Sequence, residues 1–213
     1  MLNKNEFTFL GINRFHEEGY TGKNIKIASK EWVHKSYFPN VTSLNLLDGE
    51  ERCHGDLVMD YINQVAPDAK KISVRVRGKL KAEEEQYLRK NIPDIITCSQ
   101  FAGKEDVDEQ RISLWKFLNE NDCFLCCASG NEDEEKVPLL GRTDYWKTIG
   151  SCHYPQLEKA LYSNYGKYLD FMSLSNLRSS LDGKVKHQGT SFASPIFARN
   201  DCTSSRFLYR KCR

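Results

Sequence analysis

Three short segments carry side chains suited to acyl transfer, and the segment nearest the C-terminus is the most informative. Residues Gly189–Pro195 read Gly-Thr-Ser-Phe-Ala-Ser-Pro and place Ser191 at the start of an apolar run. A serine at a helix N-terminus lies beside backbone N–H groups and the positive end of the helix dipole, which favour an anion. A nucleophile in acyl transfer needs this setting, because negative charge develops beside it. Taken alone, the segment is better explained by an ordinary N-cap serine.

Two further segments supply a base and a hydrogen-bond donor. In Cys53–Ile62, His54 opens an amphipathic run, and in Phe124–Glu132, Asn131 follows a buried apolar run. Each has a plain structural explanation by itself, as a polar residue at a helix start and as part of a Gly-Asn turn. Their joint occurrence with a serine motif, in this order, favours a functional explanation.

Together the three segments resemble the subtilisin-like serine proteases (subtilases). That family carries His-Gly-Thr-His-Val-Ala-Gly, then an Asn after Ala-Gly or Ser-Gly, then Gly-Thr-Ser-x-Ala-x-Pro, and its triad order is acid, His, Ser. The likeness runs from about Gly19 to Ala198. It implies that Ser191 is the nucleophile, His54 the general base, and Asn131 the side-chain donor to the oxyanion.

The third triad position departs from the family pattern. An Asp is expected at the end of the first core strand, and the matching residue is Glu31. The extra methylene displaces the carboxylate by about an ångström, and such a misplacement can cost about a hundredfold in rate. We therefore predict a serine endopeptidase of weak activity with Glu31 as its acid. The alternative for Glu31 is a solvated carboxylate at a strand end.

Other departures support a second hypothesis. After His54, the usual Thr and His are replaced by Asp56 and Leu57. Gln100 and Phe101 stand near the family's glycines, which let a substrate backbone pair alongside the enzyme. The alternative function is therefore a catalytically inactive subtilase, a pseudoprotease that binds a peptide or a partner protein through the former cleft.

Composition is that of an ordinary globular domain. A chain of 213 residues can bury a sizeable core, so residues 1–213 are predicted to form a single catalytic domain. The net charge of +2, from 31 basic and 29 acidic residues, gives no basic face and argues against nucleic-acid or membrane-surface binding. The predicted partner is a polypeptide substrate or peptide ligand. No cofactor and no metal are predicted, and the oligomeric state is left open.

Cysteine and histidine contexts refine this prediction. Eight cysteines, with no visible export signal or membrane-spanning run, predict reduced thiols and a cytoplasmic location. Cys123-x-x-Cys126 has metal-ligand spacing, but its apolar context is better explained by a buried strand. His34, His153 and His187 lack comparable contexts and are predicted to be surface or loop residues. The acidic run 132–135 is best explained as a solvated loop.

Apolar patterns alternate between helical and strand-like along the chain. This alternation predicts an α/β, three-layer fold, with a mostly parallel central sheet and helices on both faces. Helices are expected over Phe7–Gly19, His54–Val65, Lys79–Asn91 and Val107–Glu120. Strands are expected over Ile25–Ala28, Val41–Leu47, Lys71–Val76, Ile95–Ser99, Asp122–Ala128, Trp146–Cys152 and Asp170–Leu174.

The last fifteen residues, 199–213, depart from the family pattern and form an atypical tail. Subtilases continue the nucleophile helix as Ala-Gly and a long apolar stretch, whereas the tail from Arg199 is polar and poor in helix formers. One back-translation of Ala198–Phe207, with a single A removed, encodes Ala-Gly-Met-Ile-Ala-Leu-Val-Gln-Asp-Phe. We therefore hypothesise a shifted reading frame from Arg199 and a truncated subtilase domain.

Overall fold

The computed structural model describes residues 2–44, 46–49, 51–74, 81–100, 107–183 and 186–200. Its centre is a parallel seven-stranded sheet in the order β3-β5-β1-β6-β7-β8-β9. These strands are β3 (Thr42–Ser43), β5 (Lys70–Ser73), β1 (Lys26–Ser29), β6 (Ile95–Cys98), β7 (Phe124–Ala128), β8 (Trp146–Cys152) and β9 (Phe171–Leu174). The inner strands are apolar and buried because both faces of the sheet are covered.

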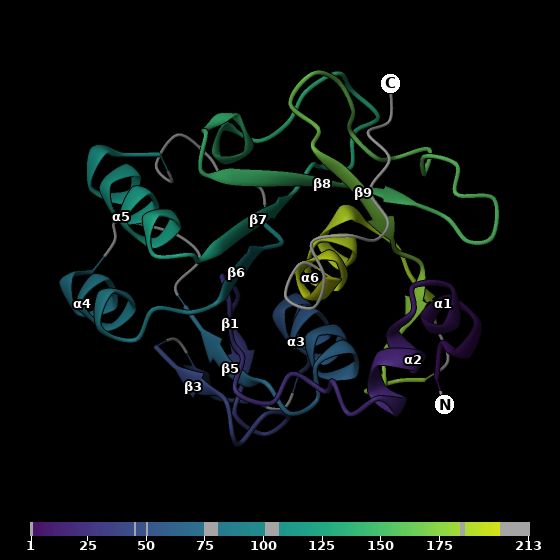
Figure 1. The fold of residues 1–213 in the computed structure, drawn as a ribbon, viewed down its shortest axis with the longest axis horizontal. Coiled ribbons are helices and arrows are strands. Elements are labelled where there is room, and N and C mark those ends of the chain that lie inside the picture. Colours follow the sequence, from purple (N-terminus) through teal and green to yellow (C-terminus); the bar gives the residue numbers. More distant parts are fainter. Residues whose placement is uncertain are drawn as a thin grey trace.

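Helices cover the two faces of this sheet (Figure 1). On one side lie α3 (His54–Val65) and α6 (Thr190–Asn200), which share a core with β1, β7, β8 and β9. On the other side lie α4 (Ala82–Lys90) and α5 (Glu109–Glu120), which share a second core with β5, β6 and β7. The predicted three-layer α/β architecture is therefore confirmed.

Small elements complete the described chain. Two short helices, α1 (Lys4–Phe9) and α2 (Ile12–Glu17), precede the sheet, and a 3₁₀ helix, η2 (Leu139–Arg142), precedes β8. The strand pairs β2 (Val33–His34) with β4 (Leu46–Leu47) and β10 (Leu177–Arg178) with β11 (Lys186–His187) form two minor sheets.

Two predicted elements are divided in the structure. The helix expected over Phe7–Gly19 is broken at Gly11, whose φ of 71° lies in the left-handed region that favours glycine. The strand expected over Val41–Leu47 becomes β3 and β4, which belong to different sheets. In both places a local apolar pattern continues across a change of chain direction, which periodicity alone does not reveal.

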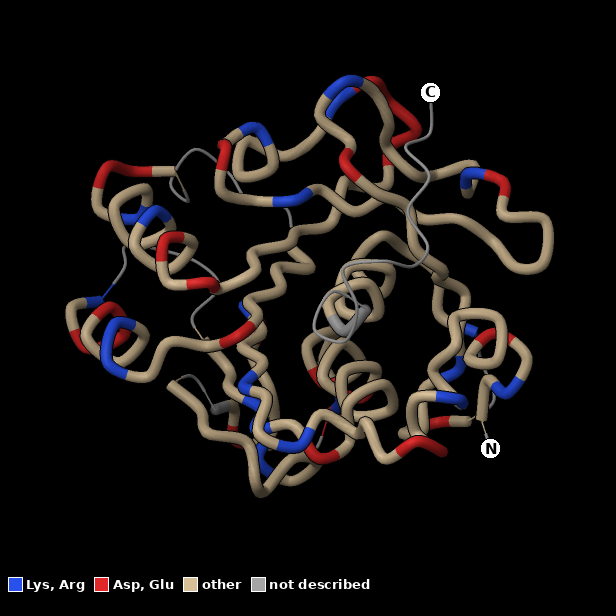
Figure 2. Tube along the Cα trace, viewed as in Figure 1, with Lys and Arg blue, Asp and Glu red and all other residues tan. Residues whose placement is uncertain are grey.

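Helix α6 lies beside the centre of the sheet, and residues 190–198 are all buried and uncharged. Charged residues of both signs are instead spread around the outer helices and loops (Figure 2). The hypothesis about the reading frame concerns residues from Arg199, and those from 201 onward lie outside the described residues. Within the described chain, no helix combines the length and apolarity needed to cross a membrane.

Candidate active site

Glu31 lies two residues beyond β1, where the chain is still tied to both neighbouring strands. The Lys30 backbone N–H donates to the Thr97 carbonyl over 2.8 Å, and the Ser73 hydroxyl donates to the Glu31 carbonyl over 2.6 Å. The Glu31 residue is 0% exposed. A solvated carboxylate at this position is therefore excluded, and a buried carboxylate requires a partner.

His54 supplies that partner from the first turn of α3. Its Nδ1 atom lies 3.4 Å from the Glu31 Oε2 atom, and its side chain is 42% exposed. Gly55 makes this approach sterically feasible, because a Cβ there would lie 1.9 Å from the Trp32 carbonyl oxygen and 2.9 Å from the Glu31 Cβ. The helix start therefore packs directly on the backbone that follows β1.

The Glu31 carboxylate is shared with Gln100, which follows β6. The Gln100 Nε2 group donates to the same Oε2 atom over 2.9 Å. The other oxygen, Oε1, is buried without a hydrogen-bond partner among the described residues. The contact of 3.4 Å with His54 is longer than the usual 2.7–2.9 Å or so of a charge-assisted bond. The carboxylate therefore faces the imidazole but holds it loosely.

Ser191 lies in the first turn of α6, as its motif predicts. It is 9% exposed, and its hydroxyl donates to the Ser99 carbonyl over 2.7 Å. The next residue, Phe192, packs its ring against the His54 ring with centroids 5.6 Å apart. The helix starts of α3 and α6 are thus neighbours. Within the described chain, however, no hydrogen bond joins Ser191 to His54.

Asn131 lies beyond β7 and faces the same helix start. Its Oδ1 atom accepts from the Thr190 backbone N–H over 2.9 Å and from the Thr190 hydroxyl over 3.1 Å. Because a backbone N–H needs an acceptor, this bond fixes the orientation of the Asn131 amide and leaves its NH₂ group available. Asn131 and Ser191 line one pocket, together with Ser99, Gln100, Ala128, Gly130, Glu132, Pro138 and Thr190.

His34 was predicted to be a surface or loop residue, and the structure shows that this prediction is wrong. His34 is 6% exposed, and its Nδ1 atom lies 2.7 Å from the Asp56 Oδ2 atom. Asp56 is 0% exposed and also accepts from the backbone N–H groups of His34 and Cys53, each over 2.8 Å. Asp56 stands where the family has Thr, and this departure was the one available sequence signal for the pair.

Of the six described cysteines, five are buried and Cys53 is half-buried. Burial raises the pKa of the half-buried Cys53 thiol, and a thiolate is the reactive form of cysteine. Cys123 and Cys126 are buried in and beside β7, in agreement with the interpretation of their spacing as part of a strand.

Comparisons with known proteins address the fold. No model of a known protein family matches the sequence, and no curated protein matches it. Similar solved structures include the prenylagaramide maturation protease PagA, at 18% identity over 88% of this chain and 77% of that one, with a TM-score of 0.70. A lanthipeptide protease has 17% identity over 92% and 78%, with a TM-score of 0.64. A cold-adapted subtilisin-like serine proteinase has 19% identity over 83% and 75%, with a TM-score of 0.56. The chain therefore has the subtilisin-like fold.

Proposed function

We propose that this protein is a serine endopeptidase of weak activity that cleaves polypeptides through Ser191, His54 and Glu31. In this mechanism the Ser191 Oγ atom attacks a peptide carbonyl, and His54 takes its proton and returns it to the leaving amine. Glu31 orients the imidazole through Nδ1. Asn131 donates its amide, and Ser191 its backbone N–H, to the oxygen that becomes negative.

The observation that carries the proposal is the pairing of His54 with a fully buried carboxylate. The imidazolium formed during attack lies beside the Glu31 carboxylate, and little solvent is present around that buried group to screen the interaction. The imidazole is meanwhile accessible to a substrate because its side chain is 42% exposed. The available NH₂ group of Asn131 lines the pocket that Ser191 also lines.

The proposed mechanism requires a rearrangement of the Ser191 side chain. The Ser191 hydroxyl donates to the Ser99 carbonyl and must rotate about χ1 to donate to the His54 Nε2 atom instead. Such rotation exchanges one staggered well for another and breaks one hydrogen bond, with a net cost of about 0.5–1.5 kcal/mol. Substrate binding beside Ser99 favours the change by competing for that carbonyl.

The proposed substrate class is supported by the mechanism and by the names of two similar structures. Two of these are a maturation protease and a lanthipeptide protease by their names. We propose that the substrate of the present chain is likewise a polypeptide, and that precursor peptides are among its substrates. The reduced state of the six described cysteines is consistent with our further proposal of a cytoplasmic location.

A second function, peptide binding without catalysis, is favoured by a separate observation. The same carboxylate oxygen that should orient His54 also accepts from Gln100, while Ser191 donates elsewhere. A site in this arrangement retains a pocket and donor groups for a peptide but has no activated serine.

A fluorophosphonate probe applied to the full chain separates the two functions, since it reacts only with a serine that a working base has activated. We expect slow labelling that disappears in Ser191→Ala and His54→Gln. His187→Gln is the matched control, because the His187 ring packs on the same Phe192 ring at 5.8 Å. Folded protein that shows no labelling would contradict the enzyme and support the binding function.

A further inference from the structure

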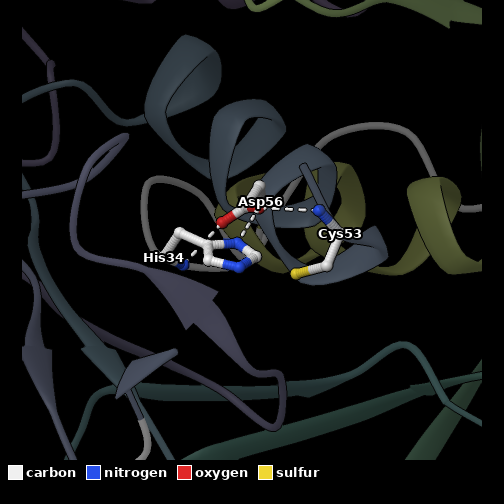
Figure 3. Close-up of side chains that lie close together, drawn as sticks. All are labelled: His34, Cys53 and Asp56. Carbon is white, nitrogen blue, oxygen red and sulfur yellow. Dashed lines mark hydrogen bonds and ion pairs between the residues drawn. The ribbon is translucent and has the colours of Figure 1, made fainter. Parts of the chain in front are cut away.

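A second cluster of reactive side chains lies directly beside the candidate site but takes no part in its mechanism. One ligand atom from each of His34, Cys53 and Asp56 lies within 4.8 Å of the others. Figure 3 shows the His34 ring and the Cys53 sulfur on the same side of the Asp56 carboxylate. Imidazole and thiolate are the ligand pair preferred by zinc and related divalent cations.

Hydrogen bonds to Asp56 fix the tautomer of the imidazole. A carboxylate oxygen can only accept, so in the neutral ring the His34 Nδ1 atom carries the proton that it donates over 2.7 Å. The lone pair then lies on Nε2, which is the arrangement of a histidine that binds a metal with a carboxylate behind it. Within the described chain, no hydrogen bond involves Nε2.

The same carboxylate holds the backbones of both prospective ligands. Asp56 accepts from the His34 N–H and the Cys53 N–H, each over 2.8 Å, and is itself 0% exposed. One buried anion thus fixes the end of β2 relative to the N-cap of α3. Ligands that the fold already holds in place lose little conformational freedom when an ion binds, and this favours binding.

The three members of the cluster differ in burial. Cys53 is half-buried, whereas His34 and Asp56 are buried. Gly49 lies over the ring, where a Cβ would come 3.9 Å from the His34 Nε2 atom. The Cys53 sulfur caps the start of α3, and its thiol donates to the Trp32 carbonyl over 3.2 Å; an ion would replace this weak S–H bond.

We propose that His34 Nε2 and Cys53 Sγ bind a zinc-like divalent cation, with Asp56 as the carboxylate that orients His34. Binding releases the thiol proton to solvent, forms one metal–sulfur and one metal–nitrogen bond, and leaves the remaining coordination positions to water. This proposed site differs from the sequence-based prediction of no metal. No signal in the sequence pointed to it, because His34 and Cys53 are nineteen residues apart and do not form a recognisable ligand spacing.

Cadmium titration of the full chain tests the proposal, because a Cd²⁺–thiolate bond absorbs in the near ultraviolet. All proteins in the test carry Cys202→Ser and Cys212→Ser, which leaves the described cysteines as the only thiols. We expect one Cd²⁺ per chain, with zinc competing for it. Cys53→Ser should abolish the band, and His34→Gln should keep the band but weaken binding at least tenfold.

One further variant and two controls test whether the arrangement of the three residues matters for binding. Asp56→Asn should weaken binding about 10–100-fold, as expected for a group that orients a ligand. Cys127→Ser and His153→Gln are matched controls that remove a thiol in β7 and an imidazole after β8, and they should bind Cd²⁺ like the parent. Thermal unfolding without metal establishes that each variant is folded. A band that persists in Cys53→Ser, or unchanged affinity in His34→Gln, would overturn the proposal.

Discussion

The start of α3 carries two histidine–carboxylate pairs that differ in almost every physical respect. In the first, His34 and Asp56 are both buried, their atoms lie 2.7 Å apart, and the carboxylate accepts two further backbone bonds. In the second, His54 is 42% exposed and lies 3.4 Å from a Glu31 oxygen that Gln100 also uses. An imidazole and a carboxylate thus form a short, buried contact in the first pair and a long, partly exposed contact in the second.

The difference shows what each pair is suited to do. A carboxylate whose two oxygens both accept hydrogen bonds stabilises the folded state and holds its imidazole in one orientation. In the second pair, one carboxylate oxygen is buried without a described hydrogen-bond partner, which lowers the stability of the folded state. Such a carboxylate indicates a role other than stabilising the fold. The His54–Glu31 pair therefore agrees with the proposed catalytic contact, whereas the His34–Asp56 pair stabilises the fold and holds its imidazole in one orientation.

Removal of each carboxylate should give the largest contrast. Asp56→Ala leaves the His34 ring and two backbone N–H groups without an acceptor, so we expect it to lower the free energy of unfolding by about 3–5 kcal/mol. Glu31→Ala should lower it by less than about 1 kcal/mol, because it also removes a buried charge whose desolvation is poorly compensated. Urea denaturation of both variants measures the two losses.

Asp56→Asn serves as the control of matched volume for this comparison. It keeps the shape of the side chain but loses the charge, so its loss should lie between that of Asp56→Ala and zero. Equal losses for Asp56→Ala and Glu31→Ala would show that both pairs are structural. The distinction drawn between them would then fail.

The second prediction concerns the length of the acid in the looser pair. The backbone around Glu31 is bonded to both neighbouring strands, so we expect a shorter acid there to keep the same backbone position. Glu31→Asp should let the carboxylate meet His54 at normal distance and raise the rate of fluorophosphonate labelling about 10–100-fold. Glu31→Gln, which has the same length without the charge, should lower the rate. A slower Glu31→Asp would mean that Glu31 is adapted to its site or is not the triad acid.

Sequence predicted the looser pair and missed the tighter one, for a physical reason. His54 stands at the start of a strongly patterned helix, and Glu31 follows a core strand, so the fold places them together in a way that the family pattern anticipates. His34 lies in the two-residue strand β2, whose partner β4 begins twelve residues further along the chain. No periodicity exists over two residues, so neither the burial of His34 nor its contact with Asp56 has a local signal.

The same distinction applies to the fold as a whole. His54–Val65 and Trp146–Cys152 were predicted with their observed bounds, and each is among the longer elements of its kind in the described chain. The region 7–19 was predicted as one helix, although a left-handed Gly11 divides it into two. Gln100 was expected to obstruct the substrate edge, but its bond to Glu31 depends on the meeting of β1 and β6 and could not be predicted from either segment alone.

The smallest expected effect concerns this bond between Gln100 and Glu31. Because Gln100 donates to the oxygen that faces His54, it withdraws negative charge from the contact that orients the imidazole. Gln100→Ala should strengthen that contact and raise the rate of labelling of Ser191, by no more than about tenfold, which corresponds to about 1.4 kcal/mol. The effect is small because the carboxylate stays in place and only one of its hydrogen bonds is lost.

A second Gln–Glu pair in the chain provides the control for this prediction. Gln110 donates to Glu85 over 2.7 Å between α5 and α4, in the layer on the other side of the sheet, so Gln110→Ala should leave the labelling rate unchanged. Gln100→Glu should lower the rate, because two carboxylates at one site favour protonation of one of them and so weaken the anion that His54 needs. If Gln100→Ala instead lowers the rate in a folded protein, Gln100 supports Glu31 and does not compete with His54. The long contact of 3.4 Å would then be the working distance of this pair.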